Sequence, residues 1–241
     1  ALFDYDTAFR AVNIAMAQGT IQWASGTTLN LLADYRRTPS LQLTNALAAD
    51  PSVALADLIA SLGESGTRDQ AKSLTPISKI FLAGVTQQFG PRWQAGLDVR
   101  WSSLTGTPAI GALPETPGTG TIMTYTAQVI ANNLTSMQDI AVVSGALLRG
   151  RTTDAEQASA TWRFSPRPAW TIEPGVRWYR QQDTAGVKLT RTTPSLKVSY
   201  RLRERFIIEA EGDFERSRTT GPQIDEDIDR VFFYLGWRWD F

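Results

Sequence analysis

The last twelve residues, RVFFYLGWRWDF, alternate strictly between two kinds of side chain. Positions 231, 233, 235, 237, 239 and 241 are all apolar, whereas the positions between them include Arg230, Arg238 and Asp240. An alternation with a period of two residues is typical of a β-strand whose faces meet different surroundings. Because several Trp and Phe rings share one face, this strand needs a large apolar partner, which is either a sizeable protein core or lipid.

Segments 92–102, 169–181 and 205–217 show the same alternation, and each is long enough for the roughly 9–11 residues with which a tilted strand crosses a membrane. Aromatic residues on their apolar faces, and on the last segment, are eight positions apart: Trp93 and Trp101, Trp170 and Trp178, Phe206 and Phe214, and Phe233 and Phe241. Eight residues span about 26 Å, or about 20 Å at a tilt of about 40°, which is roughly the distance between the aromatic girdles of a membrane barrel. A sandwich core gives no reason for this repeated interval, so we interpret these residues as girdles.

Weaker alternation predicts further strands. They cover residues 7–18, 21–36, 123–133, 157–164 and 196–202, and two further strands, apolar on both faces, are predicted at 77–89 and 140–149. Short turns are predicted at 19–20, 90–91, 136–139, 165–168 and 203–204, and longer loops at 37–75, 105–120, 150–156, 182–187 and 218–228. The predicted strands number eleven, including the last one. Single-chain bacterial barrels have even strand numbers, so we expect twelve strands here and up to sixteen in a longer parent chain. The opening ALFDYD, without Met or signal peptide, predicts a processed product or a fragment whose upstream region is missing.

Composition excludes several classes of function. The chain has no Cys and no His, which removes disulfides, the usual zinc ligands, thiol nucleophiles and imidazole bases. Lys and Arg balance Asp and Glu at 24 each, so the net charge gives no reason to expect a nucleic-acid partner. No stretch approaches the eighteen apolar residues of a membrane helix. We therefore predict no enzyme and no catalytic, cofactor-binding or metal site.

Charged residues occupy the polar faces of the predicted strands. Facing lipid, an Arg or Lys near the membrane midplane would cost about 2–4 kcal/mol, so these rows are expected to face the inside of the barrel. The predicted lumen-lining charges are Asp98, Arg100, Glu173, Arg177, Arg191, Lys197, Arg201, Arg203, Glu209, Glu211, Asp213 and Glu215. Two readings stay open: a transverse field across a water path, or mutual neutralisation inside a narrow or plugged barrel.

The loop at 37–75 carries a helical pattern. Asp50 is a candidate N-cap, Pro51 suits the first helical position, and Gly63 is a candidate end. The apolar stripe consists of Leu55, Leu58, Ile59 and Leu62. This helix either packs on its own loop or on the barrel wall, folds into the lumen as a constriction or plug, or docks a partner protein.

The final strand resembles the C-terminal recognition signal of Gram-negative outer-membrane β-barrels. The residues that match are Gly236, Trp239 and Phe241: a glycine, an aromatic residue three positions on and a terminal aromatic residue. The resemblance implies that the barrel assembly machinery reads this strand. More faintly, the segment RRTPSLQLTNAL, residues 36–47, is similar to C-terminal barrels that follow tetratricopeptide repeats in large outer-membrane proteins, some of which are similar to exopolysaccharide export porins.

Together these patterns predict an all-β fold: an antiparallel up-and-down transmembrane β-barrel of about 12 strands, forming one domain over residues 1–241. The expected location is the bacterial outer membrane, with the bilayer and lipopolysaccharide as surroundings. The expected function is a channel or translocation pore for polar solutes or an exported polymer such as exopolysaccharide, constricted by the 37–75 loop. The alternative is a structural anchor or assembly partner with a filled lumen.

Overall fold

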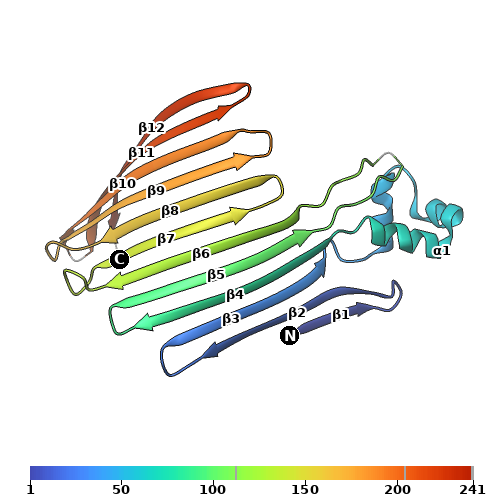
Figure 1. The fold of residues 1–241 in the computed structure, drawn as a ribbon, viewed down its shortest axis with the longest axis horizontal. Coiled ribbons are helices and arrows are strands. Elements are labelled where there is room, and N and C mark those ends of the chain that lie inside the picture. The colour runs from blue at the N-terminus through green and yellow to red at the C-terminus, as the bar shows by residue number, and fades with distance from the viewer. Residues whose placement is uncertain (112, 204, 240–241) are drawn as a thin grey trace. The chain divides into compact units, whose positions relative to one another are not determined.

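The computed structural model describes residues 1–111, 113–203 and 205–239. Within these residues the chain forms one antiparallel sheet of twelve strands, each hydrogen-bonded to its neighbours in sequence (Figure 1). The strands are β1 Leu2–Asp6, β2 Ala11–Gln22, β3 Thr27–Arg37, β4 Ile77–Phe89, β5 Trp93–Leu104, β6 Gly120–Asn132, β7 Ile140–Arg149, β8 Thr153–Arg163, β9 Trp170–Asp183, β10 Lys188–Arg203, β11 Phe206–Gly221 and β12 Ile224–Trp239. The predicted antiparallel meander and its twelve strands are confirmed, whereas closure into a barrel stays a prediction.

The chain groups into two compact units. The first consists of residues 1–21, 29–83 and 99–123, and it contains β1 with the helices η1, Leu43–Ala49, and α1, Leu55–Ser73. The second consists of residues 22–28, 84–98 and 124–241, and it contains the whole of β7 to β12. The registers of β7 to β12 therefore define faces within a single unit.

The last strands are longer than the sequence predicts, and three predicted loops are wrong. Residues 150–152, 184–187 and 222–223 connect the strands where longer loops are expected, and β12 begins at Ile224 rather than Arg230. The pairs Arg218–Asp227 and Thr220–Asp225 continue the ladder through this region. Side chains here are mostly polar on both faces, so the alternation that reveals a half-apolar strand is absent although the backbone pairing continues. The connections at 38–76 and 105–119 are long, close to the loops predicted at 37–75 and 105–120.

The first hairpins also differ from the prediction. The turn expected at 19–20 lies inside β2, and the chain turns instead at residues 23–26, where the N–H of Trp23 donates to the carbonyl of Thr27 at 2.9 Å. Gly26 adopts φ 81°, a conformation that glycine reaches readily. Trp23, which falls inside the strand predicted at 21–36, lies in this turn. The predicted strand at 7–18 is replaced by β1 and β2, which pair from Leu2–Met16 to Asp6–Ala11.

The loop between β3 and β4 is helical, as predicted, but its boundaries differ. The helix α1 begins at Leu55 after Ala54, and Asp50 instead accepts hydrogen bonds from the N–H and the hydroxyl of Ser52 at 3.0 and 2.6 Å. Asp favours both helix caps and turns of this kind, which explains the error. Gly63 ends a first helical segment with φ 72°, and the helix then resumes to Ser73.

The helices pack around a small core within the first unit. Its buried members are Phe9, Leu41, Ala46 and Ala71, with Ala11, Leu43 and Leu58 packed against them. Of the predicted apolar stripe, Leu58 contacts this core, Leu55 and Ile59 are half-buried, and Leu62 is 46% exposed. The packing agrees with the reading in which the helix packs on its own loop. The constriction remains a prediction.

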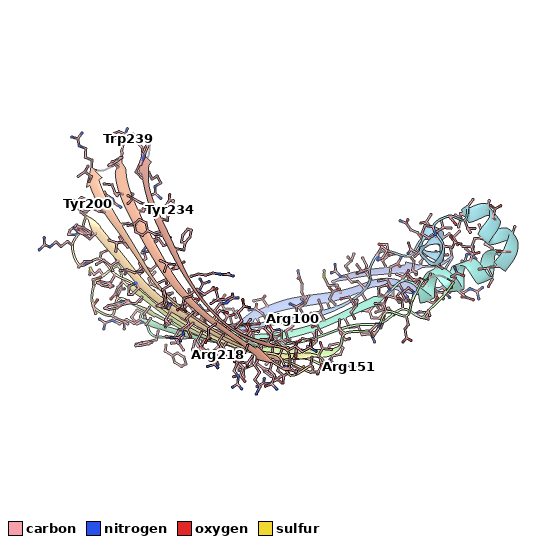
Figure 2. The ribbon with its side chains drawn as sticks, turned by 90° about the horizontal axis from the view of Figure 1, so that it is seen from above. Arg100, Arg151, Tyr200, Arg218, Tyr234 and Trp239 are labelled. Carbon is pink, nitrogen blue, oxygen red and sulfur yellow. The ribbon has the colours of Figure 1, made fainter. Side chains whose placement is uncertain are left out.

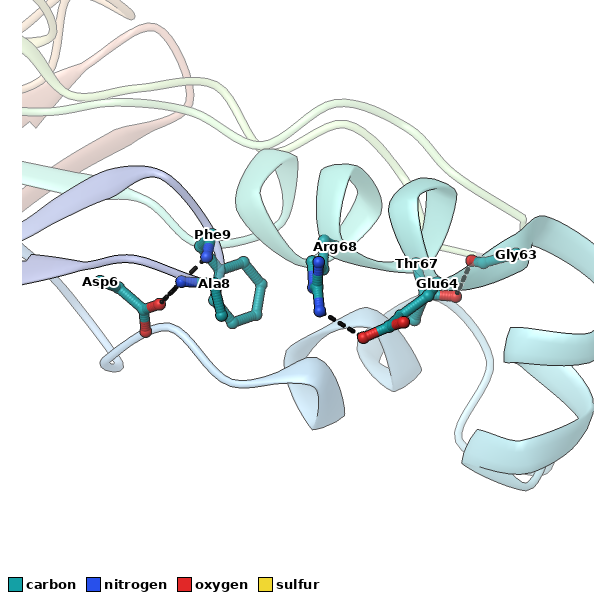
Figure 3. A network of polar contacts seen from close by, with 7 residues as sticks. All are labelled: Asp6, Ala8, Phe9, Gly63, Glu64, Thr67 and Arg68. Carbon is teal, nitrogen blue, oxygen red and sulfur yellow. Dashed lines mark hydrogen bonds and ion pairs between the residues drawn. The ribbon is translucent and has the colours of Figure 1, made fainter.

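Polar contacts hold the ends of this core (Figure 3). A carboxylate oxygen of Asp6 accepts hydrogen bonds from the N–H groups of Ala8 and Phe9 at 2.9 and 3.0 Å, and so fixes the turn that presents the Phe9 ring. The hydroxyl of Thr67 donates to the carbonyl of Gly63 at 2.9 Å, across the break in α1.

No helix in the described part of the chain has the length and apolarity needed to cross a membrane.

Asp139 organises the connection between β6 and β7. Its side chain accepts hydrogen bonds from the N–H of Leu134, the N–H and hydroxyl of Thr135 and the N–H of Ser136 at 2.6, 2.6, 2.6 and 3.3 Å, and the residue is 1% exposed. Burial by itself would raise the pKa of Asp139, but the hydrogen bonds from Thr135, Leu134 and Ser136 outweigh it and lower the pKa to about 2. The ionised carboxylate therefore stabilises the turn.

We expect Asp139→Asn to lower the urea midpoint of the folded protein at neutral pH, because the amide removes an acceptor and the charge. The pKa is depressed in the folded state, so the stabilisation is fully present above the ordinary value of 3.8 and is lost as the pH falls through about 2. Wild-type stability should decline over that interval, and the variant should show a flatter decline. Asp225→Asn, at an exposed position, is the control; equal midpoints for Asp139→Asn and wild type would contradict the assignment.

Candidate functional site

Strands β9 to β12 separate their side chains into two faces of different chemistry. The register places Trp170, Tyr200, Ile208 and Trp237 in one row across β9 to β12. Side chains alternate along each strand, so a row three residues further along β9 belongs to the opposite face, and it runs Glu173, Lys197, Glu211 and Tyr234. We name these the apolar face and the charged face.

The apolar face is strongly exposed. On β12, Val231, Phe233 and Trp237 have 77%, 69% and 71% of their surface exposed. Trp170 packs on Tyr200 with ring centroids 4.6 Å apart, and Phe206 packs on Trp239 at 5.6 Å. Figure 2 shows Tyr200 on β10 and Trp239 on β12 among the side chains of this region. Soluble monomers rarely expose so large a continuous apolar surface, so this face is suited to an apolar partner.

The predicted girdle residues of β9 and β11 occupy two levels of the apolar face. Trp170 and Phe206 lie near the strand ends at the 164–169 and 204–205 connections, which we name the Phe206 end. Trp178 and Phe214 lie eight residues further toward the opposite end, which we name the Gly221 end. Phe233 is beside Gly212 in the register. Trp93 lies on β5 in the second unit and Trp101 on β5 in the first.

The apolar face becomes charged near the Gly221 end, which the sequence reasoning missed. Arg149 pairs with Glu156 at 2.9 Å, Arg216 with Asp229 at 3.9 Å, and Arg218 with Asp225 and Asp227 at 3.9 and 3.8 Å. By the register, these charged residues lie on the same face as the apolar residues that precede them toward the Phe206 end. The available signal was the matching parity of Arg216, Arg218, Asp227 and Asp229, which is visible once the strands are extended.

Ion pairs link the strands on the charged face. Lys197 lies 3.7 Å from Glu209, whose carboxylate also accepts a hydrogen bond from the hydroxyl of Ser199 at 3.5 Å. Glu215 lies between two arginines, at 3.5 Å from Arg191 and 3.8 Å from Arg230. The structure thus joins two of the four predicted basic residues of β10 to two of the four predicted acidic residues of β11, and it adds Arg230, which the sequence reasoning did not assign.

The other predicted lumen charges differ in their surroundings. Glu173 is opposite Lys197 in the register, and Arg177 is opposite Thr193. A carboxylate oxygen of Asp213 is buried without a hydrogen-bond partner among the described residues. The register shifts between Arg201 and Arg203, so Arg203 pairs with Phe206 and the regular alternation does not extend to it. Asp98 lies over Gly84 in the second unit, and Arg100 belongs to the first.

Polar hollows lie on the charged face. One, of about 280 Å³, is near the Phe206 end, and its lining includes Arg163, Thr171, Glu173, Lys197, Ser199, Arg201, Ile207, Glu209 and Arg238. A second, of about 420 Å³, is closer to the Gly221 end, and its lining includes Gln157, Arg177, Tyr179, Arg191, Thr193 and Glu215. Such sites can hold charged or hydroxyl-rich solutes by ion pairing and hydrogen bonding.

The predicted assembly signal is described in part. Trp239 contacts Phe206, and the Tyr234 side chain lies over Gly236, where it occupies the space that a larger residue would need. Phe241 lies outside the described residues. Comparison of the sequence with protein-family models and with curated proteins finds no match.

A double-mutant cycle on Arg191 and Glu215 should give a coupling energy of roughly 0.2–1 kcal/mol, the range for partly exposed ion pairs. The variants are Arg191→Gln, Glu215→Gln and their combination, and the measurement is the free energy of unfolding in urea. Glu173 and Arg177, which lie four residues apart on β9, serve as the matched control pair and should show no coupling. Equal coupling in both cycles would contradict the observed pairing.

Proposed function

We propose that this protein is an outer-membrane β-barrel whose apolar face contacts lipid and whose charged face lines a water-filled path. The observation that carries the proposal is the opposition of these faces on the same strands: Phe233 and Trp237 exposed on one side, and Lys197, Glu209 and Glu215 on the other. In a soluble sheet an apolar face of this extent would be covered by a core.

The positions of the aromatic residues along the strands support contact of the apolar face with a bilayer. Following the register from β9 across β10 and β11, Trp178 is level with Arg216 on β11 and Asp229 on β12. Phe214 lies two residues from that level and Phe233 four residues from it, both toward the Phe206 end. From Trp178 on β9 to Phe233 on β12, the aromatic position is therefore displaced by about 13 Å along the strand direction, over about 14 Å perpendicular to it. A line through the three residues is inclined by roughly 40°. Strands of membrane barrels are tilted by about 35–45°, so these residues suit one flat interface.

The charges at the Gly221 end support the same orientation. The pairs of Arg216 with Asp229 and of Arg218 with Asp227 begin where the aromatic level ends. Lipid-facing charges are costly at the midplane and nearly free at the interface, so this boundary suits the headgroup region. The long connections at 38–76 and 105–119 follow the odd-numbered strands β3 and β5, just as the connection at Gly221 follows β11, and long loops are extracellular in bacterial barrels. We therefore propose that lipopolysaccharide surrounds the barrel at the Gly221 end.

The proposed activity is passage of polar solutes or of an exported polymer along the charged face. The hollows of about 280 and 420 Å³ supply hydrogen-bonding and charged groups for such a cargo. We propose no enzymatic activity, and we propose the barrel assembly machinery as the partner during biogenesis on the pattern of Gly236 and Trp239. The 37–75 loop is the proposed constriction.

A structural anchor is the second candidate. The pairing of Lys197 with Glu209 and of Glu215 with Arg191 and Arg230 favours it, because neutralised charges suit a filled lumen. The self-packed core around Phe9 and Ala71 would then present the helical loop to another protein.

Leu196→Arg tests the lipid-facing side. Leu196 lies between Pro174 and Gly212 in the register, midway between the aromatic levels, so an Arg there should destabilise the protein by about 2–4 kcal/mol in bilayers. Urea titration in lipid vesicles measures the change. Ser199→Arg, on the charged face of the same strand, is the matched control and should cost far less. Similar losses from the two variants would contradict the lipid-facing assignment.

Single-channel conductance in a planar bilayer tests the pore. We expect steady current from the refolded protein, or current that appears when residues 40–75 are replaced by a short Gly/Ser linker. A variant with residues 106–118 replaced in the same way controls for loop length and should conduct like the wild type. Silence in every variant, with folding confirmed by circular dichroism, would reject the pore and leave the anchor.

A further inference from the structure

The hollow at the Phe206 end of the charged face has an excess of positive charge. Among the described residues, its lining has four cationic and two anionic side chains: Arg163, Lys197, Arg201 and Arg238 against Glu173 and Glu209. These groups come from β8 to β12, so several strands converge on one small volume of about 280 Å³. Convergent cations of this kind are suited to a carboxylate or phosphate group.

Two of the cations are available to a ligand. Lys197 is engaged by Glu209 at 3.7 Å, whereas Arg163 and Arg201 make no ion pair and no side-chain hydrogen bond with any residue that the structure describes. The backbone N–H of Arg201 donates to the carbonyl of Ala169 at 2.7 Å, which holds the strand on which this guanidinium is carried. Arg is well suited to such a site, because its planar group binds carboxylate or phosphate through two parallel hydrogen bonds.

Other features of the same face agree with an anionic ligand. Ile207 lines the hollow at 8% exposure and lies between Arg201 and Arg238 in the register, so an apolar residue separates the two cations. The second hollow also has more basic than acidic groups, with Arg177 and Arg191 against Glu215. The acidic residues Glu211 and Asp213 of β11 line neither hollow.

We propose that the hollow at the Phe206 end is a binding site for the carboxylate or phosphate groups of an anionic solute or polymer, with Arg163 and Arg201 as its principal contacts. The inference adds to the proposed pore that its cargo is anionic. Only the transport of this cargo rests on the proposed function. Binding itself requires no open channel. The site would hold the anion at the Phe206 end of the charged face.

Isothermal titration calorimetry on the folded protein in detergent micelles tests binding directly. The probes are polygalacturonate and inorganic phosphate, with neutral dextran as the control polymer. We expect polygalacturonate to bind, more weakly as salt is raised, and dextran not to bind. Binding of phosphate as well would identify a site for single anions, whereas binding of polygalacturonate alone would identify a polymer site. Absence of binding by both anions would overturn the proposal.

Paired substitutions locate the site. Arg163→Gln combined with Arg201→Gln should weaken polygalacturonate binding by roughly tenfold or more, since charge-assisted hydrogen bonds are lost. Arg216→Gln combined with Arg218→Gln removes two charges from the opposite face and should leave binding unchanged. Arg201→Lys keeps the positive charge but removes the guanidinium, so it should keep part of the affinity. This result would show that the loss in the double variant comes from the lost charges and not from unfolding. Equal weakening by the two double variants would overturn the assignment.

Ion selectivity separates this inference from the pore itself. In a bilayer with a KCl gradient, the reversal potential of the wild type should indicate anion preference, and the Arg163→Gln, Arg201→Gln variant should shift it toward cations. Current with cation preference in the wild type would overturn the anionic cargo while supporting a pore. Binding without any current would support the anion site and reject the pore, so the failures are distinguishable.

Discussion

The register between neighbouring strands is the constraint on which the rest of the structure depends. A slip of one residue would turn every side chain of a strand to the other face. In the observed register Ile208 lies between Tyr200 and Trp237, while Lys197 lies between Glu173 and Glu211. Apolar residues thus meet apolar neighbours and charges meet opposite charges across several strands at once. A single slipped strand would carry lysine into the apolar row and leucine into the charged one.

The sequence was most informative where the two faces of a strand differ. In β11 apolar residues alternate with the acidic residues up to Glu215, so the strand and its two faces could be predicted. The alternation disappears where both faces are mostly polar, as from Arg216 to Asp229, and there the predicted strands are too short and loops are predicted in their place. The charged margin of the apolar face was missed for the same reason.

Local turn chemistry limited the other predictions. Asp50 has the side chain of a helix cap but holds a turn with Ser52, and Gly63 interrupts a helix that then continues to Ser73. The hollow at the Phe206 end could not be found from one strand, because Arg163 and Arg201 come from β8 and β10 and only the sheet brings them near one volume. Alternation identifies a face, whereas a site on that face depends on the registers of several strands.

The central claim is that one face of β10 meets lipid and the other meets water. The chain has no Cys, so single cysteines at positions 195 to 201 of the reconstituted protein can each carry a nitroxide label. Accessibility to oxygen, which concentrates in lipid, and to a water-soluble nickel complex can then be measured at each position by electron paramagnetic resonance. We expect oxygen to dominate at 196, 198 and 200 and the nickel complex at 195, 197, 199 and 201. Accessibility that does not alternate, or that favours nickel at every position, would contradict the lipid-facing sheet.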